Sequence, residues 1–352
     1  MPATMNPLAR QPNPTAREAS PVALVAPPEE QEYQQAREAF LAPERSGNKG
    51  LLLLGTLVLF ALSMSRGNSV QHLAVLIPVL FFHELGHWSG MQLFGFKNVK
   101  MFFIPFFGAA VSGRNQEAKG WMEALVLLLG PLPGLLVGLS VAVGAAAVKS
   151  PVLVNVATML LLINGFNLLP LVPLDGGRLF QLLIFSRHRY LENAFTLITS
   201  LLLMGVALAL TTPILGVVAF FNVVGLMRQV RLLRQVRDLR VNHPSLDPTP
   251  EQLDDDTLRA LHQSACLVTR LQKGASTADA AKLRAQAMKD LHQRVCQRPP
   301  SLLSSLGLFG LWFGGMVALL LGCVLVAGGM APQRQGGGTA SPPPSTSASA
   351  TP

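Results

Sequence analysis

The sequence predicts an all-α polytopic membrane protein of about seven transmembrane helices, with a short membrane-associated hairpin loop and a small cytoplasmic helical module. Half of the 352 residues are hydrophobic and only 13% are charged, whereas soluble domains carry about 25% charged residues. Apolar runs of span length recur along most of the chain. The segment before them is polar and rich in proline and alanine, so we expect a disordered tail and no cleavable signal peptide.

Composition divides the chain into consecutive parts. We expect a disordered tail, a membrane core, a helical module, a C-terminal transmembrane helix and a flexible tail, over residues 1–49, 50–228, 229–300, 301–331 and 332–352.

The membrane core begins with two apolar segments. The first, 51–64, is close to the shortest length that spans a bilayer, and the second covers 70–96. Residues 97–119 contain a run rich in Phe, Pro and Gly that is too short and irregular for a span. It fits either a hairpin beside a cleft or an aromatic loop at the membrane interface.

Four further apolar segments complete the core, over 121–148, 151–173, 193–210 and 213–227. In the first of them Gly130, Gly134 and Gly138 recur every fourth residue, which predicts a close helix–helix contact. Arg228 opens a basic stripe that suits either anionic lipid head groups or a solvated helix face. The remaining expected helices are two amphipathic ones and a final uncharged span, over 250–273, 276–296 and 302–331.

The basic residues predict the orientation of the chain. With a cytoplasmic N-terminus, only Arg66, Lys149 and Arg334 fall outside, and every other Lys and Arg falls on the inside segments. The net charge of +9 is therefore a positive-inside signal and gives no support for a nucleic-acid partner. We expect a multi-pass protein of the cell membrane with its N-terminus in the cytoplasm and its C-terminus outside.

The second apolar segment contains the motif HELGH over residues 83–87, and Glu84 is its only acid. Ionisable side chains at membrane depth are costly unless they pair or bind a ligand, so they indicate a functional site. On a helix, His83 and His87 lie one turn apart on the same face, which suits the capture of a metal ion. Glu84 lies beside the first histidine, where it could accept a proton from a metal-bound water.

The fourth apolar segment ends in NLLPLVPLDGG over residues 167–177. Two prolines and a double glycine end a regular helix, and unwound backbone inside a membrane protein usually lines a site. The charge of Asp175 needs a cation, either the nearby Arg178 or a metal. Because the histidine pair lacks a third ligand, the metal is the favoured partner.

Together the two motifs resemble the site-2 protease family of intramembrane zinc metalloproteases, whose second motif has the form NxxPxxxLDG. The resemblance covers roughly residues 70–185. It implies one Zn²⁺ per chain held by His83, His87 and Asp175. It further implies Glu84 as the general base and Asn167 as the residue that fixes or polarises the substrate carbonyl.

The same resemblance implies that the loop at Phe107, Gly108 and Ala109 pairs with an unwound substrate. One departure is Pro133-Gly134, where family members often have Ala-Asn. The expected partners are a transmembrane protein substrate and the lipid bilayer, with a homo-oligomer left open. The implied function is hydrolysis of a peptide bond within or near the transmembrane segment of a membrane protein, as in regulated intramembrane proteolysis. The alternatives are an inactive homologue or a metal-ion transporter.

Overall fold

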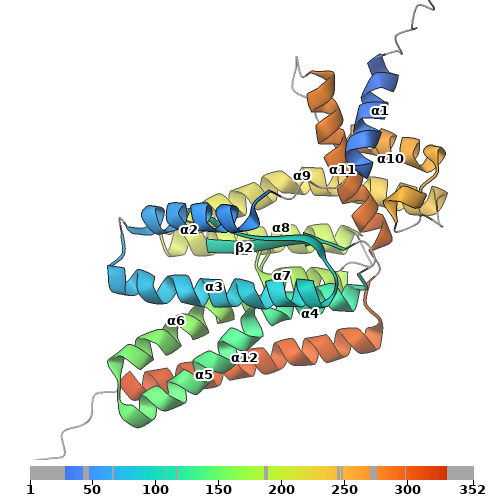
Figure 1. Ribbon diagram of the computed structural model, residues 1–352. Coiled ribbons are helices and arrows are strands. Elements are labelled where there is room, and N and C mark those ends of the chain that lie inside the picture. The colour runs from blue at the N-terminus through green and yellow to red at the C-terminus, as the bar shows by residue number, and fades with distance from the viewer. Residues whose placement is uncertain are drawn as a thin grey trace, which may run out of the picture.

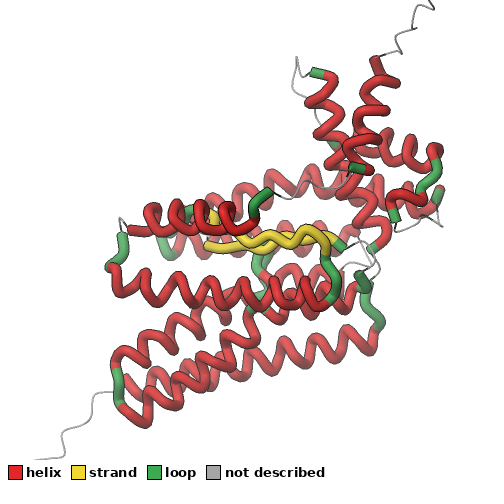
Figure 2. The backbone as a smooth tube through the Cα atoms, viewed as in Figure 1, coloured by secondary structure: helices red, strands yellow, loops and turns green. Residues whose placement is uncertain are grey.

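The computed structural model consists of long helices that run side by side, with one β-hairpin among them (Figures 1 and 2). It describes residues 28–42, 47–65, 67–106, 108–115, 118–185, 189–243, 246, 249–269, 276–297 and 299–330. The predicted helical membrane protein with a short hairpin is confirmed at this level. Five helical segments are long and apolar enough to cross a membrane: Gly120–Val148, Pro151–Leu168, Tyr190–Ala209, Pro213–Asn242 and Leu302–Gly328.

The two helices that precede the hairpin fall outside this set of spans. α2 (Lys49–Ser65) has only 17 residues. α3 (Val70–Leu93) is long enough, but polar side chains, among them His83, Glu84 and His87, lower its mean hydropathy. Of the roughly seven spans that the sequence predicts, five are thus confirmed among the described residues as long, apolar helices.

The hairpin consists of β1 (Lys97–Ile104) and β2 (Gly108–Arg114), which pair antiparallel with Phe103 opposite Ala109. β1 packs on α2, where the ring of Phe103 lies 5.3 Å from that of Phe60 between centroids. The backbone N–H of Phe103 donates a 3.0 Å hydrogen bond to Thr56 Oγ1. Of the two readings of residues 97–119, the structure therefore shows the hairpin.

α4 (Gly120–Leu129) and α5 (Pro131–Val148) form one span that is interrupted at Gly130. Pro131 has no N–H to donate back into the preceding turn, so a new helix begins there. α6 (Pro151–Leu168) packs along α5. A Cβ atom at Gly138 would lie 3.0 Å from Leu160, which is the close contact that the glycine spacing predicts.

Beyond α6 the backbone is irregular until α7 (Asp175–Phe180), which continues into a π-helical turn, Gln181–Phe185. α8 (Arg189–Ala209) and α9 (Pro213–Asn242) then pack against each other. α9 is continuous, so the expected basic helix from Arg228 is the second half of a membrane helix. α12 (Leu302–Met330) closes the bundle against α5 and α6.

A polar helical module lies at one end of the bundle (Figure 1). α10 (Asp255–Val268) and α11 (Thr277–Cys296) fall where amphipathic helices were expected, and a short 3-10 turn, Pro250–Gln252, precedes them. The structure differs from the expected tail over 1–49, because α1 (Pro28–Leu41) packs on α11. Residues 1–27 lie outside the described part of the chain.

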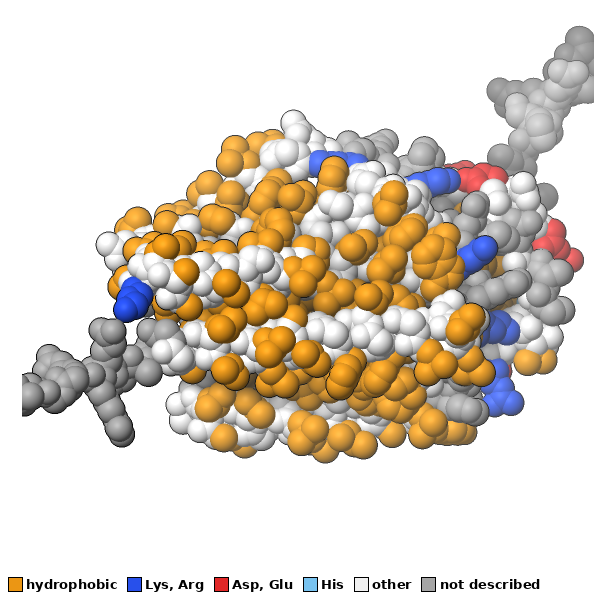
Figure 3. All heavy atoms as spheres, turned by 90° about the horizontal axis from the view of Figure 1, so that it is seen from below, with side chains coloured by type: hydrophobic (Ala, Val, Ile, Leu, Met, Phe, Trp, Pro, Cys, Tyr) orange, Lys and Arg blue, Asp and Glu red, His pale blue; other side chains and the backbone are white. Residues whose placement is uncertain are grey.

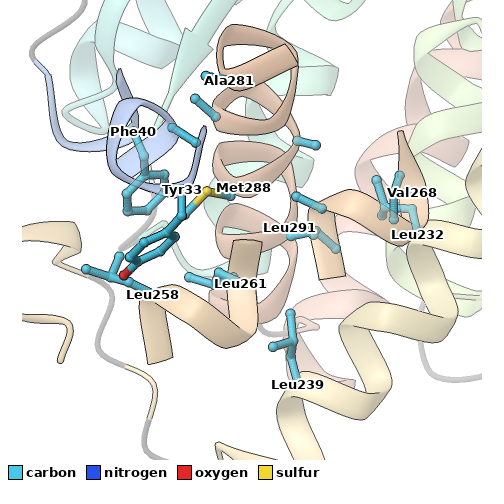
Figure 4. Close-up of a cluster of buried hydrophobic side chains, with 14 of the residues drawn as sticks. Tyr33, Phe40, Leu232, Leu239, Leu258, Leu261, Val268, Ala281, Met288 and Leu291 are labelled. Atoms are coloured by element: carbon cyan, nitrogen blue, oxygen red, sulfur yellow. The ribbon is translucent and has the colours of Figure 1, made fainter. Parts of the chain in front are cut away.

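The module has its own hydrophobic core, to which α1, α9, α10 and α11 contribute side chains (Figure 4). Tyr33 and Phe40 from α1 enter it beside Met288 and Leu291 from α11. The Tyr33 hydroxyl donates a 2.7 Å hydrogen bond to Asp255 Oδ1. These aromatic residues explain why α1 is ordered: its polar composition hides one apolar face that needs a partner.

One face of α11 joins the module to the bundle. Asp290 lies 3.4 Å from Arg228 Nη2 and 3.8 Å from Arg114 Nη2, at the end of β2. The same face continues with Arg294 beside Glu192 and Gln297 beside Glu123. We call Asp290, Arg294 and Gln297 the docking face. In Figure 3 most of the visible charged side chains lie towards this end, and hydrophobic side chains are spread over the middle of the molecule.

Candidate metal centre

α3 carries the first two residues of the site. His83 and His87 project from the same face one turn apart, and their ring centroids lie 4.8 Å from each other. Their Nε2 atoms are 3.2 Å apart. Only 3% of His83 and 7% of His87 is exposed. The helical spacing of the HELGH motif thus places two imidazole nitrogens within reach of a single ion.

The third residue comes from the irregular segment after α6. Asp175 begins α7, and its Oδ2 lies 3.2 Å from His83 Nε2 and 3.1 Å from His87 Nε2. Gly176 and Gly177 follow it because a Cβ atom at either position would overlap the backbone of residues 168–172. The turn that the LDGG sequence makes therefore delivers the carboxylate to the histidines.

The outer nitrogens of both imidazoles have hydrogen-bond partners. His87 Nδ1 lies 2.8 Å from the backbone carbonyl oxygen of Val126 in α4, and His83 Nδ1 lies 2.9 Å from Asn164 Oδ1 in α6. The amide nitrogen of Asn164 donates to the Leu160 carbonyl oxygen at 2.8 Å, which turns Oδ1 towards His83. Since both partners are acceptors, the hydrogen-bond network assigns the proton of each histidine to Nδ1.

This assignment leaves a lone pair on each Nε2. Three acceptor atoms, two Nε2 and the Asp175 Oδ2, then converge at 3.1–3.2 Å from one another. Acceptors packed this closely repel each other unless a cation lies between them. In a tetrahedral zinc site with bonds of about 2.0–2.1 Å, ligand atoms are about 3.3 Å apart. The donor set and its spacing therefore fit Zn²⁺.

Glycines make room for the two helices that support the histidines. A Cβ atom at Gly86 would overlap the Leu129 carbonyl oxygen, so this residue lets α3 approach α4. A Cβ atom at Gly130 would overlap the imidazole of His87. At Gly134, it would overlap the side chain of Asn164. The departure at Pro133-Gly134 is thus matched by an asparagine from α6 that occupies the space.

Of the other predicted residues, the structure describes Glu84, Asn167, Gly108 and Ala109. Glu84 follows His83 directly and is 7% exposed. Asn167 is half-buried and donates from Nδ2 to the Ile163 carbonyl oxygen at 3.0 Å. Ala109 lies in β2, and a Cβ atom at Gly108 would be 3.8 Å from Leu80, in the turn of α3 before His83. Phe107 lies outside the described residues.

Two supporting residues were not foreseen from the sequence. Asn164 is fully buried, and the only signal that could have indicated it is an amide in the middle of an apolar span. Trp312 of α12 donates from Nε1 to the Leu168 carbonyl oxygen at 2.8 Å, where α6 ends. Its sequence context gives no signal, because a tryptophan in a span usually faces lipid or the interface.

A second group of potential ligands lies in the module: Glu32, His262 and Cys266. It differs from the first because the guanidinium of Arg284 contacts the Glu32 carboxylate. A cationic side chain already balances this acid, so we do not interpret the group as a metal centre.

Comparisons with known proteins agree with the geometry. A zinc metalloprotease of Methanocaldococcus jannaschii is 27% identical over 150 residues, which is 39% of this chain and 43% of that protein. The stage IV sporulation protein FB of Bacillus subtilis is 30% identical over 144 residues, or 40% of this chain and 49% of that protein. Rip3 of Mycobacterium tuberculosis is 33% identical over 134 residues, or 36% of this chain and 33% of that protein.

No family model matches the chain. The chain spans less than half the length of these curated relatives. The resemblance inferred from the two motifs is confirmed at the level of distant homology. The chain is similar to zinc metalloproteases of the site-2 protease type.

Proposed function

We propose that this chain is an intramembrane zinc metalloprotease that hydrolyses a peptide bond within or near the transmembrane segment of a membrane-protein substrate. The observation that carries the proposal is the convergence of three acceptor atoms from His83, His87 and Asp175 next to the buried Glu84. A non-enzymatic metal carrier would need polar groups at several depths, whereas these are concentrated at one.

Each residue has a role in the proposed reaction. His83, His87 and Asp175 would hold one Zn²⁺, which would supply a Lewis acid and a water that is nucleophilic at neutral pH. Glu84 accepts the proton of the attacking water and returns it to the leaving amine nitrogen. Asn167 fixes or polarises the substrate carbonyl with the second N–H of its Nδ2, since the other N–H already donates to the Ile163 carbonyl oxygen within α6.

The hairpin supplies a binding edge for an unwound substrate. Thr56 already occupies the outward N–H of Phe103, so α2 covers the outer edge of β1. Ala109 lies opposite Phe103 and Val111 opposite Met101, and their backbone groups therefore point to the outer edge of β2. Among the described residues this edge pairs with no further strand. A substrate segment adding there would begin beside Gly108 and Ala109.

We further propose seven spans, with α2 and α3 added to the five apolar segments, in the cell membrane. The module and the basic residues near it lie at one end of the bundle, which supports a cytoplasmic N-terminus and an external C-terminus. A tag before Met1 should be protected from external protease in intact cells, and a tag after Pro352 should be digested; the reverse pattern would overturn this orientation.

The experiment that tests the function is the metal content of the purified chain. We expect one zinc per chain in the wild type and none in Asp175→Ala, because two histidines alone hold zinc weakly. Asp279→Ala, which removes an exposed carboxylate of α11, is the control and should keep its zinc. A wild type without zinc would refute the proposal, and zinc without proteolysis of any membrane substrate would favour a carrier or an inactive homologue.

A further inference from the structure

One buried polar side chain contacts the proposed zinc site without belonging to the two motifs. Asn164 lies in the last turns of α6 and is fully buried, on the same apolar helix as the buried Leu160 and Leu161. A buried amide is costly unless all its polar groups are satisfied. Its only recorded side-chain partners in the described chain are the Leu160 carbonyl and His83.

The two hydrogen bonds leave only one orientation for the amide. A carbonyl oxygen can only accept, so the Asn164 nitrogen must face Leu160. Oδ1 must then face His83 Nδ1, which it can approach to 2.9 Å only if that nitrogen carries a proton. A proton on Nδ1 leaves Nε2 of the neutral imidazole as an acceptor. The orientation of Asn164 therefore selects the tautomer in which His83 offers its inner nitrogen.

The space around Asn164 restricts its movement. A Cβ atom at Gly134 of α5 would overlap the amide, so the side chain fills the gap left by the missing one. His87 has an equivalent partner, the Val126 carbonyl oxygen, but that acceptor belongs to the backbone of α4 and no substitution removes it. Asn164 is thus the point at which the outer contacts of the two histidines can be tested by mutation.

We propose that Asn164 is a positioning residue for His83, which fixes its tautomer and ring orientation for metal binding. The inference rests on the proposed zinc site. Groups that hydrogen-bond the outer nitrogen of a metal-binding histidine orient the ring and raise its basicity, and their loss weakens metal affinity about 10–100-fold. A purely structural role in the contact between α5 and α6 would change the stability of the chain without this specific loss.

The test compares zinc affinity in three variants of the full chain, purified in detergent and titrated against a chelator of known affinity. Asn164→Leu removes the acceptor and should weaken zinc binding about 10–100-fold. Asn164→Asp keeps an oxygen facing His83 Nδ1, and its protonated carboxyl can donate to the Leu160 carbonyl oxygen as the amide does, so it should recover most of that loss. The matched control is Ser200→Ala, which removes a buried bond of 2.7 Å from a side chain to its own helix backbone in α8. It should bind zinc as the wild type does.

The outcomes separate this inference from the proposed function. Wild-type zinc affinity in Asn164→Leu would overturn the positioning role and leave the zinc site standing. Equal losses in Asn164→Leu and Asn164→Asp would also overturn it, because an oxygen facing His83 would then make no difference to zinc binding. If the wild type held no zinc, the proposed function would fail and the inference with it. Thermal unfolding of the zinc-free forms shows whether a variant is folded before its affinity is interpreted.

Discussion

The indole Nε1 of Trp312 donates a 2.8 Å hydrogen bond to the backbone carbonyl oxygen of Leu168. Leu168 is the last residue of α6, and the unwound segment that leads to Asp175 begins directly after it. Helix ends leave carbonyl groups without partners, and a buried one needs a donor from elsewhere. α12, the last of the described helices, therefore supports the backbone that carries the third candidate ligand.

Trp312→Phe tests this support. The phenyl ring keeps the packing beside Phe180, whose ring centroid lies 4.9 Å from the indole, but it has no N–H. Leaving the Leu168 carbonyl unsatisfied should cost about 1–3 kcal/mol of stability. We expect a lower midpoint of thermal unfolding than in the control Trp121→Phe, since no hydrogen bond joins the indole of Trp121 to other described residues. Equal midpoints would show that the bond contributes nothing.

This contact also changes how the C-terminal part of the chain is interpreted. From the sequence, the final span lies outside the region that resembles the proteases. In the structure a Cβ atom at Gly165 would overlap Leu319 of α12, and one at Gly315 would reach Leu168. A truncation after Arg228 would therefore remove a helix of the core together with the module.

Gly130→Ala should disturb the metal centre directly. An added Cβ atom would overlap the imidazole of His87, a buried ring whose Nδ1 is already held by the Val126 carbonyl oxygen. We expect zinc affinity to fall by about 10–100-fold or more. Gly144→Ala in the same span meets nothing within 4 Å and is the matched control. Zinc titration of both variants decides, and equal affinities would contradict the placement of His87.

The docking face of α11 can be tested without truncation. Asp290→Asn combined with Arg294→Gln removes the charges that face Arg114, Arg228 and Glu192. If the module limits substrate entry, this variant should keep its zinc and cut membrane substrates at altered rates. Lys282→Gln changes an exposed charge elsewhere on α11 and is the control. Unchanged rates on several substrates would discard the gating role in favour of a stabilising one.

His262 should make the module sensitive to mild acid. Burial, followed by Arg284 and Arg259, lowers the pKa of His262, while the Glu32 carboxylate opposes them. The folded state thus prefers the neutral imidazole. Its contribution to stability is present above the unfolded pKa of about 6.5 and is lost as the pH falls through that region towards the lower folded pKa.

The corresponding measurement is thermal unfolding of the full chain at pH 7.5 and pH 5.5. We expect the wild type to lose stability in acid and His262→Gln, which cannot gain a proton, to lose less. A matched control is His72→Gln, near the other end of the bundle, which should behave as the wild type does. Identical pH dependence in all three chains would rule out His262 as the cause.

A feature could be predicted from the sequence when the residues that form it lie close to one another in the chain. The histidine pair, the acid beside it and the turn at Asp175 follow from helical spacing and from prolines and glycines close to one another in the chain. Asn164 and Val126 could not be assigned, because their roles depend on which faces of α4 and α6 meet α3. The folding of α1 into a helix was missed for the same reason, because its partners are distant in the sequence. The hydrogen bond between Tyr33 and Asp255, for example, joins residues 222 positions apart.

Glu84→Gln is the measurement that tests the central claim most directly. Zinc content and cleavage are determined for the wild type and the variant. Cleavage is measured on tagged single-span membrane proteins that are co-expressed with each of the two. Because Glu84 is assigned as the base and not as a ligand, the variant should retain one zinc per chain. Its cleavage rate should fall by about 10²–10⁴-fold. Cleavage at the wild-type rate would contradict the mechanism, and loss of the zinc would place Glu84 among the ligands.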